Sequence, residues 1–254
     1  HTRLQGDWSS DVCSSDLTGT VSASTIGTDI GTVTVTQSGG TTFSSTVNAA
    51  TVTLTNTTGT ITFNGALTAT TLNTAAAGYN VAINAGGTIT NAVTFSNTGT
   101  VTLGDASGDS VTFTGGVTAT APSQVNLAGT VQSTNTAISL GDSDTPVVLT
   151  ANTTLSGNTS GNITLGGTVN GGFTLTLNTT GTTTLSGVIG GSNALTSLTT
   201  NTGGTVAINT TAITTTGAQT FGENATLGAD VTLTSNSSGN ISFAGTVEIG
   251  RAHV

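Results

Sequence analysis

The feature that most constrains this chain is a recurring pair of apolar residues two positions apart. Val33 and Val35 form one such pair, flanked by Thr and followed by a Gly-rich turn. A spacing of two places both apolar side chains on one face of a β-strand and the polar residues on the other. The pattern recurs at Val52/Leu54, Ile61/Phe63, Val81/Ile83, Val101/Leu103, Val111/Phe113, Val125/Leu127, Ile163/Leu165, Leu175/Leu177, Val206/Ile208, Val231/Leu233 and Ile241/Phe243. The sequence thus predicts many short strands separated by Gly and Asn turns.

These strands repeat at a short interval. Ile61, Val81 and Val101 begin strands 20 residues apart, and the run Asn56–Phe63 returns with small changes as Asn178–Leu185. A period this short, built from strands and turns, indicates a solenoid in which each coil buries its apolar face by stacking on its neighbours. We therefore predict an all-β fold, a parallel β-helix (β-solenoid) of about 20 residues per coil and about eleven coils. The preference of parallel crossovers predicts right-handed winding.

Composition agrees with this fold class. Hydrophobic residues make up 34% of the chain and charged residues only 5%, whereas disordered chains combine low hydrophobicity with high charge. Thr and Val fit pleated strands, and Lys, Arg and Met are almost absent. The competing architecture is a row of β-sandwich modules, which repeat at about 80–100 residues and usually have aromatic residues in their cores. Seven Phe and one Tyr favour the solenoid.

The two ends of the chain differ from the repeat. One codon choice for Asp11–Leu17, read on the complementary strand, codes Glu248–Val254. Such complementarity is typical of an adapter ligated to both ends of a sequenced DNA fragment. We therefore expect residues 1–17 and 248–254 to be adapter-derived and to remain outside the solenoid, and residues 18–247 to be a fragment of one continuous repeat array. The ends contain His1, Arg3, Trp8, Cys13, Arg251 and His253, which are all the His, Arg, Trp and Cys residues of the chain.

Residues 18–247 consequently contain seven acidic residues and no basic one. A segment without Lys or Arg cannot neutralise phosphates, so we expect no nucleic-acid partner. The same lack argues against docking on anionic membranes, and no apolar run is long enough for a membrane helix. The absence of Cys in this segment is compatible with export through an oxidising compartment. We expect a secreted protein.

Some of the repeats resemble a known group of surface proteins. The turns Asn-Thr-Thr-Gly-Thr and the segments Thr216–Phe221 and Leu227–Ser235 look like repeats of filamentous-haemagglutinin-like and autotransporter passenger proteins. The resemblance extends over essentially all of residues 18–247. It implies an adhesin secreted across an outer membrane and displayed on the bacterial cell surface as a right-handed parallel β-helix.

Few residues could carry chemistry. Nucleophilic triads and zinc sites need His or Cys, which residues 18–247 lack, so we predict no catalytic residues and no cofactor. The acidic pairs Asp105/Asp109 and Asp142/Asp144 could serve polysaccharide cleavage or calcium binding. Polysaccharide clefts usually add aromatic and basic residues, and the calcium-coil pattern Gly-Gly-x-Gly-x-Asp does not recur. We favour turn formation by these Asp residues and keep calcium as the weaker alternative.

Runs of alternating Thr suggest a regular surface. We expect them to project from one face, although Ala82, Asn126 and Ala207 interrupt equivalent positions. A flat Thr array resembles the surface of ice-binding proteins. The runs are Thr32/Thr34/Thr36, Thr51/Thr53/Thr55, Thr112/Thr114 and Thr232/Thr234.

The function expected from the sequence is structural and adhesive, not enzymatic. A rigid stalk would make weak multivalent contacts with host or environmental surface glycans or proteins, since Trp and Arg anchors are missing and Tyr79 could equally lie at a coil edge. The alternative is an ice- or crystal-surface-binding solenoid. A polysaccharide-active β-helix enzyme is a third hypothesis.

Overall fold

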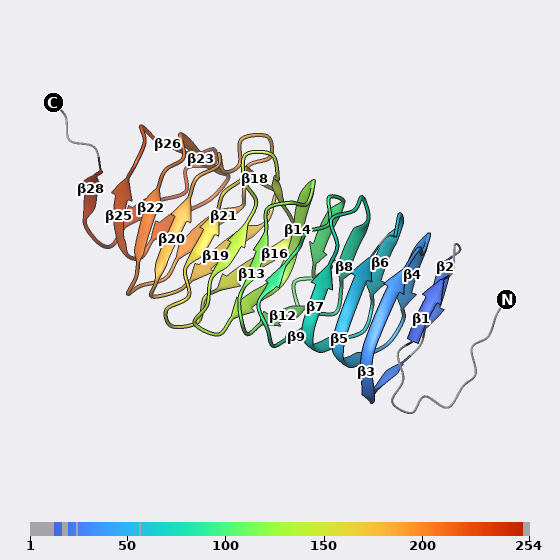
Figure 1. Cartoon of the computed structure of the whole chain (residues 1–254). Helices are drawn as coiled ribbons and strands as arrows, with labels where there is room; N and C mark the ends of the chain where they lie inside the picture. Colours follow the sequence, from blue (N-terminus) through green and yellow to red (C-terminus); the bar gives the residue numbers. More distant parts are fainter. Residues whose placement is uncertain (1–12, 17–19, 24, 56, 251–254) are drawn as a thin grey trace.

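The computed structural model describes residues 13–16, 20–23, 25–55 and 57–250. They form a parallel β-solenoid of about 11 turns with roughly 21 residues per turn, which confirms the predicted fold class and repeat length. Strands β1 and β28 lie at opposite ends of the elongated stack (Figure 1). The right-handed winding stays a prediction. No helix in the described ranges is long and apolar enough to cross a membrane.

The described strands form three sheets, in which every strand pairing is parallel. The largest sheet contains β1 (Cys13–Asp16), β2 (Thr20–Ala23), β3 (Ile26–Thr36), β4 (Gly40–Phe43), β5 (Val47–Thr55), β6 (Thr60–Phe63), β7 (Leu67–Thr74), β8 (Asn80–Ile83), β9 (Gly87–Ile89), β11 (Thr100–Leu103), β12 (Ser110–Phe113), β14 (Gln124–Ser133), β16 (Val147–Ser156), β18 (Val169–Asn170), β19 (Thr174–Asn178), β21 (Ser197–Thr200), β24 (Gln219–Phe221) and β27 (Ile241–Phe243). The second contains β10 (Val93–Thr94), β13 (Val117–Ala119), β15 (Ile138–Leu140), β17 (Ile163–Leu165), β20 (Thr182–Leu185), β22 (Thr205–Ile208), β25 (Asn224–Leu227) and β28 (Val247–Ile249). The third contains β23 (Ala212–Thr215) and β26 (Thr232–Ser235).

Three ladders of residues in register follow the stack, one residue per coil. The first contains Val21, Thr41, Ile61, Val81, Val101, Val125, Val147, Val169, Ile189, Ile213 and Leu233. The second contains Ile26, Val47, Leu67, Gly87, Val111, Val131, Leu155, Leu177, Thr200, Phe221 and Phe243. The third contains Val93, Val117, Ile138, Ile163, Thr183, Val206, Ala225 and Val247. In the three coils before Val93, the third side is formed by Val33, Val52 and Leu72, so each coil has three sides around one core.

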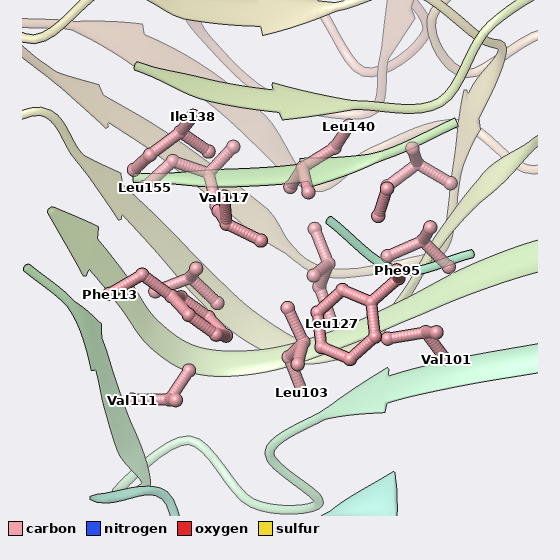
Figure 2. Packing of buried hydrophobic residues seen from close by; sticks show 14 of the residues in the cluster. Phe95, Val101, Leu103, Val111, Phe113, Val117, Leu127, Ile138, Leu140 and Leu155 are labelled. Carbon is pink, nitrogen blue, oxygen red and sulfur yellow. The ribbon is translucent and has the colours of Figure 1, made fainter. Parts of the chain in front are cut away.

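The core contains ten of the twelve apolar pairs that the sequence predicted; Val231 and Leu233 are only partly buried, and so is Phe243 of the last pair. Figure 2 shows how side chains from the three sides, such as Leu103, Phe113 and Ile138, point toward one another in the interior. Phe43 stacks on Phe63 with ring centroids 4.9 Å apart, so aromatic side chains also align from coil to coil. The buried members of the apolar pairs are Val33, Val35, Val52, Leu54, Ile61, Phe63, Val81, Ile83, Val101, Leu103, Val111, Phe113, Val125, Leu127, Ile163, Leu165, Leu175, Leu177, Val206 and Ile208.

Two expectations about the core need correction. Tyr79 is not at a coil edge: it is fully buried, and its hydroxyl donates a hydrogen bond to the Leu54 carbonyl at 3.0 Å. Burial raises the pKa of Tyr79 to about 12. Ile241 is in register with buried Gln219 but is 39% exposed, because β27 pairs with β24 on one side alone in the described structure. Phe243 is partly buried against Phe221, with ring centroids 4.6 Å apart.

The stack also extends into both ends of the chain. Strand β1 pairs with β3, with Cys13 opposite Val33, and β28 pairs with β25. The expectation that the ends remain outside the solenoid is therefore wrong for Cys13–Asp16 and Glu248–Ile249. Residues 1–12, 17 and 251–254, with Trp8, lie outside the described residues. The adapter origin stays a prediction, since an open sheet edge can pair with an extended segment whatever DNA encodes it.

Polar side chains join adjacent coils on the outside of the stack. Asn84 donates a hydrogen bond to the Asn64 side chain at 2.9 Å, and Asn91 donates one to the Thr71 hydroxyl at 2.9 Å. Gln132 bonds to the Thr112 hydroxyl at 2.8 Å in the same way. The abundance of Asn and Thr thus has a structural role, because these side chains form hydrogen bonds with one another between adjacent coils.

Candidate interaction surface

The four candidate calcium ligands lie in two separate turns. In the turn between β11 and β12, Asp109 Oδ2 accepts hydrogen bonds from the N–H groups of Asp105 at 2.9 Å and Ala106 at 2.7 Å. In the turn before β16, Asp142 Oδ1 accepts hydrogen bonds from the N–H groups of Asp144 and Thr145, both at 3.0 Å. Asp109 and Asp142 therefore hold their turns together, which is the role that the sequence analysis favoured.

The solenoid does not bring the two acidic turns together. The first turn follows Leu103, which is in register with Leu127. The second turn precedes Val147, which is in register with Val125. Val125 and Leu127 are opposite ends of one segment of β14, so the two turns lie at opposite ends of that side of the coil. Burial and the adjacent Asp109 carboxyl raise the pKa of Asp105. Within the described residues, no three His, Cys, Asp or Glu side chains gather where they could hold a metal ion.

We predict that calcium has little effect on stability. Each turn offers two carboxylates, of which one already accepts backbone hydrogen bonds. Since a ligand stabilises a protein only through preferential binding to the folded state, thermal melts with millimolar calcium and with a chelator should nearly coincide. Asp109→Asn and Asp142→Asn serve as comparisons, because each removes a carboxylate. A calcium-dependent rise of about 10 °C in the parent that either variant abolishes would contradict this prediction.

The predicted Thr runs do not form one face. Those in β3 and β5 are in register, with Thr34 opposite Thr53, but the next residue in that ladder is Asn73. Thr112 lies on β12 opposite Gln132, and Thr234 lies on β26 opposite Thr214. The prediction of a single array built from these runs is wrong, because they lie on different sides of the coil.

A different set of hydroxyl residues forms a continuous line along the outside. These residues lie one position before the second core ladder from β12 onward, so their side chains point outward. Over seven successive coils the position is never interrupted by a residue without a hydroxyl. We call this line the hydroxyl column. Its members are Ser110, Thr130, Thr154, Thr176, Thr199, Thr220 and Ser242.

The hydroxyl column is partly shielded from solvent and has a shorter counterpart on the second sheet. The five Thr residues are half-buried by their neighbours along the sheet, while Ser110 and Ser242 are exposed. On the second sheet, a similar line runs through Thr118, Ser139, Thr164 and Thr184 before Ala207 interrupts it. Neither line contains an ionisable side chain, so both present neutral donors and acceptors spaced by about 4.8 Å, the separation of hydrogen-bonded strands.

A shallow groove of about 370 Å³ lies across β3, β5 and β7, and Thr90, directly after β9, completes its lining. Its outer lining includes Asn48, Ala50, Thr68, Thr70 and Thr90. None of its lining residues is acidic or aromatic. Asp105 and Asp142 lie outside it, so the groove does not combine a cleft with paired carboxylates as glycoside cleavage requires.

Sequence reasoning missed the hydroxyl column because its members are not equally spaced. Thr130 and Thr154 are 24 residues apart, whereas Thr199 and Thr220 are 21 apart. A search for a fixed interval of 20 therefore misses it. The detectable signal was a Thr or Ser directly before an inward-facing residue, which is apolar in all cases except Thr200; Thr176 before Leu177 is an example.

No protein-family model, curated protein or solved structure matches this chain in the comparisons with known proteins.

Proposed function

We propose that this chain is a structural and adhesive repeat region of a secreted bacterial surface protein, and that it acts as a rigid stalk. The observation that carries the proposal is the continuity of the first two core ladders, each of which contains one residue from every one of eleven coils. Eleven coils correspond to a stack of about 50 Å. A rod of this kind separates whatever lies at its two ends by a defined distance.

The outer surface favours weak, repeated contacts over one tight site. Strong recognition normally depends on Trp, Tyr or Arg anchors in desolvated pockets. Tyr79 is buried, and Phe173, at 36% exposure, is the most exposed aromatic side chain of the described part. The outer faces are lined mainly by Thr, Ser and Asn. Such a surface suits multivalent contact with host or environmental glycans or proteins, in which avidity replaces affinity.

The proposed location rests on composition and on the resemblance of the repeats. Residues 18–247 lack Lys, Arg and Cys, and their repeats look like those of autotransporter and filamentous-haemagglutinin-like passengers. Both features support secretion and display at the outer membrane surface. We propose neither nucleic-acid binding nor catalysis for this segment. The Asp pairs act as turn residues at separate corners, which favours a structural role for them.

A second candidate function is binding to ice or another crystalline surface. The hydroxyl column favours it, because seven successive coils place a hydroxyl at the same outer position. A crystal surface repeats in space, so many individually weak contacts could form at once. The neighbouring outer line, which contains Gln132, Ser156 and Asn178, is chemically mixed. This irregularity is why the stalk remains our first proposal.

The two candidates are separated by measuring binding of the whole chain to host glycans, matrix proteins and ice. For the stalk we expect no monovalent binding tighter than about 1 µM, and retention on coated beads only when many copies are immobilised. Submicromolar monovalent binding to one target would overturn the stalk proposal. Inhibition of ice recrystallisation that is lost in Thr176→Lys but kept in Thr164→Lys would establish the second candidate.

A further inference from the structure

One acidic residue lies inside the solenoid. Glu223 directly precedes β25 and is only 3% exposed. The register of β25 with β22 and β28 places it between Gly204 in the coil below and Gly245 in the coil above. Gly204 leaves room for the Glu223 side chain in the corner between the second and third sides of the coil, and Gly245 allows the coil above to approach the Glu223 backbone.

Two backbone carbonyl oxygens, those of Thr179 and Gly181, lie in the corner that holds the Glu223 carboxyl group. Neither carboxyl oxygen accepts a hydrogen bond of normal geometry, although the Thr200 hydroxyl and the Gly204 N–H lie nearby. A Cβ atom added to Gly204 would lie 2.6 Å from Glu223 Oε2, 2.4 Å from the Gly181 carbonyl oxygen and 2.9 Å from the Thr179 carbonyl oxygen. An ionised carboxylate only accepts hydrogen bonds, whereas a protonated carboxyl can donate one to a carbonyl. The protonated form therefore suits this corner better.

Charge around the corner does not compensate an ionised Glu223. The adjoining corner segments Thr179–Gly181 and Asn201–Gly204, and strand β24, contain no titratable side chain. On the coils from β25 to β28, the titratable residues of the described chain are Asp230, which is exposed in the turn after β25, and Glu248, which is exposed on β28. Both are acidic. Ionisation of Glu223 would bury a negative charge with no positive partner among the described residues, which is costly.

We propose that Glu223 is a pH-dependent switch within the C-terminal coils: as a neutral acid it packs inside the corner, and its ionisation loosens the coils from β24 to β28. The switch is independent of the proposed stalk and adhesive function. Ile241, Val247 and Ile249 are exposed in these coils, so few apolar contacts hold them to the coils below. A local change can therefore open them without unfolding the coils below.

The direction of the pH dependence follows from burial. Burial raises the pKa of Glu223 above its ordinary value of 4.5, and the nearby Thr200 hydroxyl and Gly204 N–H offset this only in part. The folded protein therefore holds the proton to a higher pH than the unfolded chain does. This contribution to stability is fully present below the ordinary pKa and is lost as the pH rises through the raised pKa of the folded state.

The test compares the parent chain, Glu223→Gln and Asp230→Asn at pH 4 and pH 8. Gln is nearly isosteric with Glu but remains neutral at both pH values, and Asp230→Asn removes an exposed carboxyl from the same coils. For the parent and Asp230→Asn we expect melting temperatures several degrees lower at pH 8. We also expect amide protection factors in β24–β28, which correct for the base catalysis of intrinsic exchange, to be at least tenfold lower at pH 8. For Glu223→Gln we expect nearly equal melting temperatures and nearly equal protection factors at both pH values.

Two results would overturn the proposal. The first is a pH dependence of the melting temperature and of the protection factors in Glu223→Gln as large as in the parent, which would assign the effect to general charge repulsion. The second result is obtained with the parent protein alone, so it does not require that Glu223→Gln folds. An infrared titration should show one protonated carboxyl that persists well above pH 5, and ionisation of all carboxyl groups by that pH would exclude a neutral Glu223.

Discussion

Replacement of Ile163 by Asp is expected to destabilise the solenoid by more than about 4 kcal/mol. Ile163 is fully buried in the third core ladder, between Ile138 and Thr183. The substitution removes an apolar side chain and places a carboxylate where the described residues provide no cation. Thermal melting and urea titration of both proteins measure the loss. A variant that melts like the parent would show that Ile163 does not point into the core.

The next residue of the same ladder provides a matched comparison. Thr183 is fully buried, and its hydroxyl has no hydrogen-bond partner. Val has nearly the same shape without the hydroxyl, so Thr183→Val should stabilise the protein by about 1 kcal/mol. The two substitutions should therefore change the melting temperature in opposite directions. If Thr183→Val destabilised the solenoid, the hydroxyl would have to form a hydrogen bond in solution.

The sequence predicted the core well wherever an apolar pair lies inside the stack. Val101 and Leu103 show why: alternation determines which side chains share a face, and repetition determines that such faces stack. Thr183 shows the limit of this rule, because a polar residue can occupy an inward position when apolar neighbours surround it. Ile241 shows another limit, since burial also depends on whether a further coil packs above.

The candidate surface was less predictable than the core. Sequence alone located the Asp turns, but the hydroxyl column depends on which residues come into register across coils of unequal length. Paired residues of adjacent coils lie from 19 residues apart, as for Thr205 and Asn224, to 25 apart, as for Ile138 and Ile163. Glu223 was equally hard to identify, because only the register places its side chain between two glycines. Turn lengths set these positions, and turns have the weakest sequence pattern.

Substitution of Gly187 by Ala should be nearly as damaging as the core substitution. Gly187 follows β20 in a turn that lies directly on the coil below. A Cβ atom there would lie 2.0 Å from the Gly167 carbonyl oxygen, 2.1 Å from its carbonyl carbon and 2.5 Å from the Thr168 nitrogen. All three are backbone atoms, so relief requires the two coils to separate. Because coils are only about 4.8 Å apart and their ladders are continuous, we expect a loss of at least about 3 kcal/mol.

The control for this substitution is Gly108→Ala. A Cβ atom on Gly108 meets no atom within 4 Å, and its backbone is not in the left-handed region. Gly108→Ala should therefore be neutral, or stabilising by about 0.5 kcal/mol through the reduced freedom of the unfolded chain. Urea titrations of both variants, with amide exchange in β17 and β20, distinguish the two cases. Equal changes in the free energy of unfolding for the two substitutions would mean that turn glycines act through chain flexibility. A loss of stability confined to Gly187→Ala would identify close backbone contact between coils as the reason that Gly recurs in these turns.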